Sequence, residues 1–197
     1  LYAGMDETPR EEFIDGLRNQ YGDRADAVVA AYTVELDMST KTAGQAISAD
    51  RNFTWQMRAW ARAMGDSNDV YHYFFSHAPP VFRLYMPERP DLDFPGGRRG
   101  AGAYHSGDLA YAFGNVGLVG IGWNDRDREL SDQISQYWVN FATTGDPNGA
   151  GLPTWPRYDR EQEAAIEFGT DGTVAVSAVR EAKLDLFDRS YRRAVTD

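Results

Sequence analysis

The sequence has 197 residues, of which 42% are hydrophobic and 13% aromatic, a composition typical of a folded globular domain. Its formal net charge of −10 argues against nucleic acid or an anionic membrane surface as a partner, because both need clustered Lys and Arg side chains. No run approaches the roughly 18 apolar residues of a membrane-spanning helix. The absence of cysteine excludes disulfides, thiolate metal sites and a cysteine nucleophile, and is more typical of a bacterial than of a secreted eukaryotic protein.

Helix signals dominate the first third of the chain. Thr8-Pro9-Arg10-Glu11 combines a capping residue, a proline at the first helical position and the glutamate of a capping box, and predicts a helix that starts at Thr8. Asp23 is a candidate cap for a second helix, and Asp50 for a third helix that Gly65 ends. Four apolar residues recur at helical spacing along this third helix: Phe53, Met57, Trp60 and Met64.

A strand, a loop and a long helix are predicted next. Val70–Phe75 is β-branched and aromatic without polar alternation, which suits a strand buried on both faces. Pro79–Gly107 is rich in proline, glycine and arginine and is predicted to be mostly loop. The helix that follows ends at Thr144-Gly145 and carries apolar residues at helical spacing: Leu130, Ile134, Tyr137, Trp138 and Phe141.

The last quarter of the chain predicts two short strands, Ala164–Phe168 and Thr173–Ser177, around a turn. A final helix carries Leu184, Phe187 and Tyr191. Helices that separate a buried strand from later short strands predict a layered α/β fold. Because these strands do not make a complete sheet, we expect the chain to be part of a larger domain.

The chain has three histidines, and their settings differ. His72 lies inside the predicted strand and His77 at its end before two prolines, and both are expected to be structural. His105 lies between glycines in the loop Gly100–Asp108, which lets the backbone turn sharply and present an imidazole. A loop histidine on a rigid scaffold is a natural general base because its pKa lies near the working pH. Its local context leaves both a catalytic and a structural role open.

A catalytic histidine usually needs a carboxylate that orients it and stabilises the imidazolium. Asp6-Glu7 is a candidate, although two acids before a helix can also simply interact favourably with the positive N-terminal end of its dipole. The sequence contains no Gly-x-Ser-x-Gly elbow and no Gly-Gly-rich loop for an oxyanion hole. Gly65-Asp66-Ser67 follows a helix and precedes a strand, which is the context of a turn and not of a nucleophile elbow.

Several motifs, in order along the chain, resemble one known family. They are Gly4-Met5-Asp6-Glu7; Gly102-Ala103-Tyr104-His105-Ser106-Gly107-Asp108-Leu109; the helix end Trp138-x-x-Phe141-Ala142-x-x-Gly145-x-Pro147-Asn148; and Leu152-Pro153-Thr154-Trp155-Pro156. Together they resemble the type-B carboxylesterase/cholinesterase family over essentially the whole chain. The resemblance implies that residues 1–197 are the C-terminal portion of a single α/β-hydrolase domain, with helices and the last strands of the central sheet, incomplete without the N-terminal part.

The resemblance also implies site residues. Glu7 matches the acid of a Ser-His-Glu triad and His105 its base, in the acid-before-histidine order of α/β-hydrolases. Asp108 matches a family position that is commonly Glu and helps to order the histidine loop. Ser106, which directly follows His105, is expected to have the same supporting role. The serine and the oxyanion hole would lie on an N-terminal segment outside this sequence, which makes that segment the expected partner of this chain.

The expected reaction is hydrolysis of a small-molecule carboxylic ester, which needs no metal or organic cofactor. By itself, the chain is expected to be inactive. Two alternatives stay open: a cholinesterase-like adhesion or binding protein that has lost catalysis, and a stand-alone interaction domain. The presence of both Glu7 and His105 favours the enzyme, because an inactive scaffold has no chemical reason to keep both.

Overall fold

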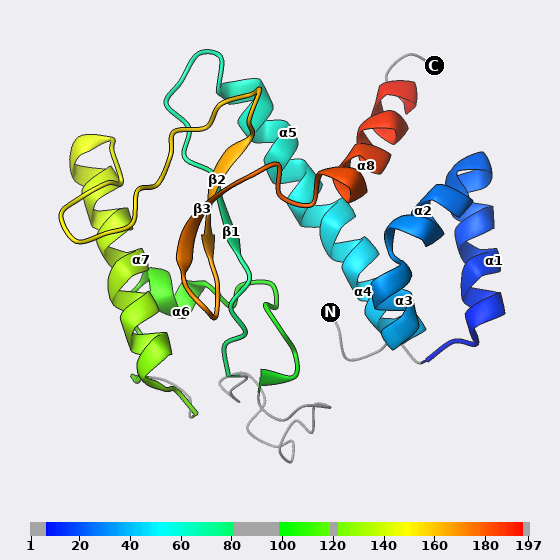
Figure 1. Ribbon diagram of the computed structural model, residues 1–197, viewed down its shortest axis with the longest axis horizontal. Helices are drawn as coiled ribbons and strands as arrows, with labels where there is room; N and C mark the ends of the chain where they lie inside the picture. Colours follow the sequence, from blue (N-terminus) through cyan, green and yellow to red (C-terminus); the bar gives the residue numbers. More distant parts are fainter. Residues whose placement is uncertain (1–6, 81–98, 119–121, 195–197) are drawn as a thin grey trace. The chain divides into compact units, whose positions relative to one another are not determined.

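The computed structural model describes residues 7–80, 99–118 and 122–194 (Figure 1). Asp6 and the other residues before Glu7 lie outside the described residues. The chain divides into two compact units. The helical unit comprises residues 1–66 and 180–197, and the sheet unit comprises residues 67–179.

The helical unit is built from short helices around one apolar core. Its helices are α1 (Arg10–Tyr21), α2 (Ala25–Ala31), α3 (Thr33–Met38), α4 (Thr40–Ala49), α5 (Trp55–Met64) and α8 (Glu181–Ala194). A 3₁₀ turn (Gly22–Arg24) precedes α2, and a π-helical turn (Asp50–Thr54) joins α4 to α5. The core of the unit consists of buried residues from α1, α2, α4 and α8: Leu17, Tyr21, Ala25, Val28, Tyr32, Ile47, Leu184 and Phe187.

All three predicted helix caps of this unit are wrong. Pro9 is the residue that precedes α1, and its carbonyl accepts the first helical hydrogen bond, from Phe13 N at 3.0 Å. Its extended ψ of 139° moves the helix start to Arg10, beyond the reach of a Thr8 capping box. Asp23 lies inside the 3₁₀ turn and does not cap α2. The sequence indicated α1, α2, α5 and α8 and correctly ended α5 at Gly65, but it missed α3 and α4 and the exact helix starts.

Asp50 lies inside a continuous helical run and has long-range partners in place of a capping role. Its carboxylate accepts hydrogen bonds from Arg180 Nε at 2.7 Å and Arg180 Nη2 at 2.6 Å, and from the Tyr32 hydroxyl at 2.7 Å. Burial and the neighbouring Asp50 charge raise the pKa of Tyr32 well above its usual range. Because these partners satisfy the buried carboxylate, the helix continues past it.

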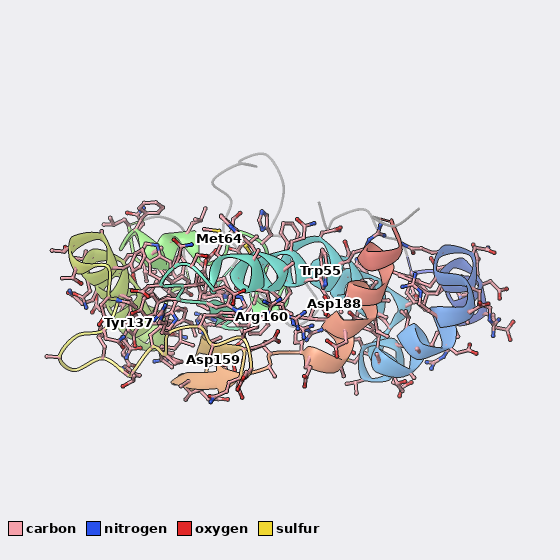
Figure 2. All side chains as sticks on the ribbon, turned by 90° about the horizontal axis from the view of Figure 1, so that it is seen from above. Trp55, Met64, Tyr137, Asp159, Arg160 and Asp188 are labelled. Atoms are coloured by element: carbon pink, nitrogen blue, oxygen red, sulfur yellow. The ribbon has the colours of Figure 1, made fainter. Side chains whose placement is uncertain are left out.

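Helix α5 turns its polar side toward α8. Arg58 is buried and donates to Asp185 at 2.8 Å, and Arg62 Nη1 donates to Asp188 at 2.7 Å. Trp55 Nε1 also donates to Asp188 at 2.7 Å (Figure 2). The apolar stripe of the same helical run is exposed, with exposed fractions between 39% and 61%: Phe53, Met57, Trp60 and Met64.

The sheet unit has three strands in the order β1 (Tyr73–Phe75), β2 (Ala164–Phe168) and β3 (Thr173–Ser177). β1 is parallel to β2, and β2 is antiparallel to β3. The two later strands match their predicted ranges. The strand predicted at Val70–Phe75 is shorter, and its side chains are half-buried, which corrects the expectation of burial on both faces. Within the described part of the chain, β1 pairs on one side only.

Two helices complete the sheet unit, α6 (Leu109–Ala112) and α7 (Asp125–Thr144). The long helix α7 confirms its predicted C-terminus, where Gly145 adopts a φ of 80°. Buried residues of α6, α7, β2 and the segment after α7 form the core of the unit: Tyr111, Leu130, Ile134, Tyr137, Trp155, Ile166 and Phe168. None of the helices in the described ranges is both long enough and apolar enough to span a bilayer.

Candidate active-site loop

His105 lies at the tip of a tight turn and is exposed to solvent. The Gly107 amide donates to the Tyr104 carbonyl at 2.9 Å, and Ser106 between them has a φ of 70°. A positive φ at the third residue alone is typical of a type II turn. Gly107 is buried, and a Cβ there would lie 2.9 Å from the Tyr104 carbonyl oxygen and 3.0 Å from Pro79 Cγ. The turn therefore needs glycine at 107 to keep its shape.

Asp108 and Ser106 support this turn in ways that the sequence did not specify. The Asp108 carboxylate accepts a hydrogen bond from the Tyr73 hydroxyl of β1 at 2.8 Å. Burial and this carboxylate raise the pKa of Tyr73. Ser106 contributes its backbone, since its carbonyl accepts from Leu109 N at 3.2 Å. Asp108 thus links the histidine loop to the sheet.

Glu7, the predicted acid, is exposed and lies three residues before α1 in the helical unit. His105 belongs to the sheet unit. The pairing of their side chains stays a prediction.

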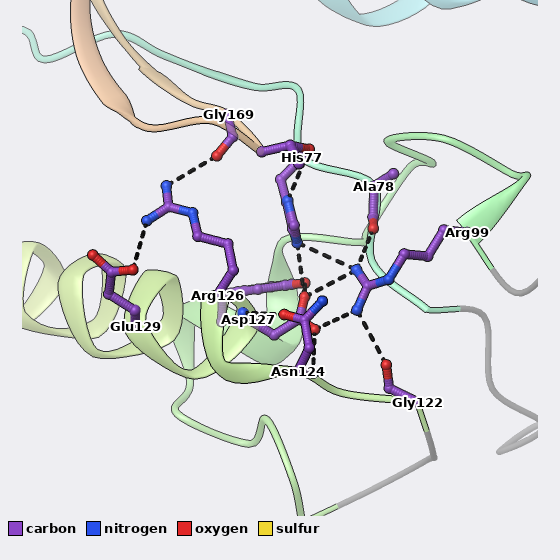
Figure 3. Close-up of polar contacts among 11 residues, drawn as sticks. His77, Ala78, Arg99, Gly122, Asn124, Arg126, Asp127, Glu129 and Gly169 are labelled. Carbon is purple, nitrogen blue, oxygen red and sulfur yellow. Dashed lines mark hydrogen bonds and ion pairs between the residues drawn. The ribbon is translucent and has the colours of Figure 1, made fainter.

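A buried polar network next to the histidine loop centres on Asp127, in the first turn of α7 (Figure 3). Oδ1 of Asp127 lies 2.7 Å from His77 Nε2 and accepts from the Tyr111 hydroxyl at 2.7 Å. Oδ2 accepts from Arg99 Nη2 and from the Asn124 amide, the latter at 2.7 Å. Burial by itself would raise the pKa of Asp127, but its donors, Arg99 first among them, outweigh burial and hold the pKa well below its usual range.

His77 and Asp127 have the contact of a catalytic histidine–carboxylate pair, yet their surroundings do not suit catalysis. His77 is 2% exposed and Asp127 is 0% exposed. The second ring nitrogen of His77 lies 3.1 Å from the Thr170 hydroxyl in the turn between β2 and β3. Since both nitrogens are occupied inside the protein, this imidazole has no free position from which to take a proton from a substrate. These contacts support the structural interpretation of His77.

His72 also has a structural setting. Its carbonyl accepts hydrogen bonds from Ile166 N at 3.0 Å and from Trp155 Nε1 at 2.9 Å. Its ring lies edge-on to Tyr158, and burial lowers its pKa. His72 therefore helps to join β2 and the segment after α7 to the chain that enters β1.

Reasoning from the sequence missed the Asp127 network. The only local signal was Asn124-x-x-Asp127, a capping box at the start of α7, which forms with Asp127 N donating to Asn124 Oδ1 at 3.0 Å. That signal indicates a helix start and gives no hint of Arg99 or His77, which are distant along the chain.

The Gly-x-Pro-Asn motif after α7 has a structural explanation. The Asn148 side chain donates to Asp146 Oδ1 at 2.7 Å and to the Trp155 carbonyl at 3.0 Å, and accepts from the Trp155 amide at 2.7 Å. These bonds hold Trp155 where its ring packs against Tyr137 and Phe168 in the core.

Within the described residues, no group of three or more His, Asp or Glu side chains is arranged to hold a metal ion.

Comparisons with known proteins identify one family. The profile of the Carboxylesterase family matches residues 5–187. The chain is 34% identical over 115 residues to a medium-chain fatty acyl-CoA hydrolase precursor from Anas platyrhynchos, covering 58% of this chain and 18% of that protein. It is 33% identical over 123 residues to carboxylesterase 4A from Bos taurus, covering 62% and 20%. It is 29% identical over 153 residues to cocaine esterase from Homo sapiens, covering 77% and 24%.

A solved structure of a PNB esterase matches 92% of this chain and 34% of its own, with a TM-score of 0.61 and 22% identity. This likeness shows the fold, and the described helices and small mixed sheet correspond to part of an α/β-hydrolase. The chain spans about a fifth of the length of the curated relatives that it matches. Because the family profile extends over nearly the whole sequence, the chain belongs to the carboxylesterase family.

Proposed function

We propose that this chain is part of a carboxylic ester hydrolase in which His105 is the general base and Glu7 the acid of a Ser-His-Glu triad. Family membership supports ester hydrolysis as the reaction class. The observation that carries the proposal is the presentation of His105, whose side chain is exposed on a turn that is fixed from several sides. The other two histidines lie in structural settings.

In the proposed mechanism, a serine on another segment of the polypeptide attacks the acyl carbon of the ester. His105 takes the serine proton during this attack and then donates it to the leaving alcohol, which gives an acyl-enzyme. Water, deprotonated by the same imidazole, then hydrolyses the acyl-enzyme and restores the serine. Glu7 would accept the Nδ1–H of His105, fix the tautomer and stabilise the imidazolium. No step requires a metal or an organic cofactor.

Replacing His105 tests this role. In the complete polypeptide, His105→Ala should lower turnover of a chromogenic short-chain ester by a factor of about 10³ or more, as removal of a triad member does. His72→Gln is the matched control, since His72 serves the strand region and not the proposed chemistry. A folded His105→Ala variant that keeps most of its activity would exclude the proposal. A complete polypeptide that shows no esterase activity with any tested ester would favour the adhesion or binding alternative.

We further propose that the partner of this chain is the N-terminal part of the same polypeptide, which supplies the serine and the oxyanion hole. Three apolar side chains just after His105 support such a contact: Leu109, Phe113 and Leu118 are 50%, 73% and 77% exposed. Exposed apolar side chains of this size, in the stretch that follows the proposed catalytic histidine, support a contact with another segment.

Separating the two parts tests this pairing. Residues 1–197 expressed alone should neither hydrolyse esters nor react with a serine-directed phosphonate, because the base has no nucleophile to activate. Adding the N-terminal part should restore both properties. If residues 1–197 alone were a monomer in solution that hydrolysed esters, this proposal would be wrong.

A further inference from the structure

Asp127 contacts one residue on each side of the loop that carries His105. Arg99 lies six residues before His105, and Tyr111 lies six residues after it. The Arg99 guanidinium binds both carboxylate oxygens of Asp127, and the Tyr111 hydroxyl donates to Oδ1 at 2.7 Å. A single buried carboxylate therefore joins position 99, before the histidine loop, to position 111, in the helix α6 that follows it. Figure 3 shows the contacts of Arg99 with Asp127.

The Arg99 end of the loop has further attachments. Arg99 Nη1 donates to the Ala78 carbonyl at 2.6 Å, and Nη2 donates to the Gly122 carbonyl at 3.1 Å. Ala78 follows the exit of β1, and Gly122 precedes α7. The planar guanidinium thus fixes the start of the loop to two other segments and to Asp127 at once, a geometry that a lysine does not reproduce.

Asp127 is fully buried, and donors from four residues satisfy its carboxylate. His77, Tyr111, Arg99 and the Asn124 amide together occupy both of its oxygens. A buried ionic cluster is often no more stabilising than a well-packed apolar one, but its directional bonds allow a single arrangement. Two of these donors flank the histidine loop: Arg99 directly precedes it, and Tyr111 lies in α6, which follows it.

We propose that Asp127 is a positioning residue for His105: by binding Arg99 and Tyr111 together, it fixes the loop that presents the catalytic imidazole. This inference rests on the proposed function of His105. Positioning of a catalytic group acts on the chemical step, since a displacement of about 1 Å can lower turnover roughly 100-fold. Loosening either end of the loop should therefore lower kcat and leave KM nearly unchanged.

Two matched pairs of variants in the complete polypeptide test the inference. Tyr111→Phe removes the hydroxyl that donates to Asp127, and Tyr137→Phe removes the hydroxyl of an equally buried tyrosine in the same core, which donates to the Pro153 carbonyl. Arg99→Lys loosens the start of the loop. Arg126→Lys alters a neighbouring arginine that likewise binds a carbonyl, of Gly169, and a carboxylate, of Glu129, but not Asp127.

We expect Tyr111→Phe and Arg99→Lys each to lower kcat by about 10-fold or more at nearly constant KM. The matched Tyr137→Phe and Arg126→Lys variants should lose thermal stability to a similar degree and keep their kcat within about twofold. Equal kcat in Tyr111→Phe and Tyr137→Phe, with His105→Ala inactive, would overturn the positioning role and leave the proposed function intact. An active His105→Ala variant would instead overturn the proposed function.

Discussion

Gly107→Ala should deform the turn that carries His105. A Cβ at this position would lie 2.9 Å from the Tyr104 carbonyl oxygen and 3.0 Å from Pro79 Cγ. Because non-bonded carbon atoms prefer separations of about 3.5–4.0 Å, the methyl group has to move away from Pro79 by at least about 0.5 Å. The same movement pulls the Gly107 amide away from the Tyr104 carbonyl, which now accepts its hydrogen bond at 2.9 Å.

The cost of this substitution follows from these two effects. Overpacking a tight site costs about 1–3 kcal/mol, and a lost backbone hydrogen bond adds about 1 kcal/mol. We therefore expect the free energy of unfolding to fall by roughly 2–4 kcal/mol in Gly107→Ala. A shift of about 0.5 Å at His105 should also lower kcat roughly 10-fold.

Denaturant unfolding of the complete polypeptide and ester kinetics measure the two quantities for Gly107→Ala. Gly172→Ala is the matched control: it also lies in a turn of the sheet unit, but its nearest neighbour would be Val174 Cγ1 at 3.9 Å, an ordinary contact. Wild-type stability and kcat in Gly107→Ala would show that the turn does not have this shape in solution.

Three further predictions concern single positions. Ser106→Gly should stabilise the protein by about 0.5 kcal/mol in denaturant unfolding, since relief of the positive φ outweighs the added chain entropy of glycine. Gly16→Ala, at an exposed position inside α1 with no atom within 4 Å of the new Cβ, should stabilise by about 1 kcal/mol in the same assay. The pKa of Asp127 is lower in the folded protein than in the unfolded chain, where it is about 4, so its ionised carboxylate stabilises the folded state above that pH. This stabilisation is lost as the pH falls toward the folded-state pKa. The melting temperature of Asp127→Asn should therefore vary less with pH below about 5 than that of the wild type.

The sequence was most informative where a pattern is local and repeated. The strands Ala164–Phe168 and Thr173–Ser177 were predicted correctly because each is a short apolar run beside the turn residues Gly169–Gly172. The end of α7 was predicted correctly because Gly145 supplies the left-handed conformation that ends a helix. The Asp50 cap was wrong because its carboxylate binds Arg180, which is 130 residues away along the chain. Helix propensity carries no information on such a partner.

The apolar stripe of α5 also shows what the sequence could not predict, namely the face of a helix that packs against its neighbour. Its spacing predicts a helix, and the helix is present. Spacing does not reveal which face packs against α8, and that face carries Arg58 and Arg62, whose charges are matched by Asp185 and Asp188. These charge pairs on the α8 side, which the spacing of apolar residues does not predict, are part of what orients α5 within its unit.

For the candidate site, the sequence indicated the residue that would perform the chemistry and Asp108 as a support of its loop, but it missed Asp127. His105 stands out because glycines surround it and because the family motif includes it. Asp127 has neither signal. Its importance arises only when folding brings Arg99 and Tyr111 onto one carboxylate, and each of these three residues is ordinary in its own stretch of sequence. A reactive side chain can stand out in its own stretch of sequence, whereas a group that positions it is defined by contacts between distant segments, which exist only in the folded chain.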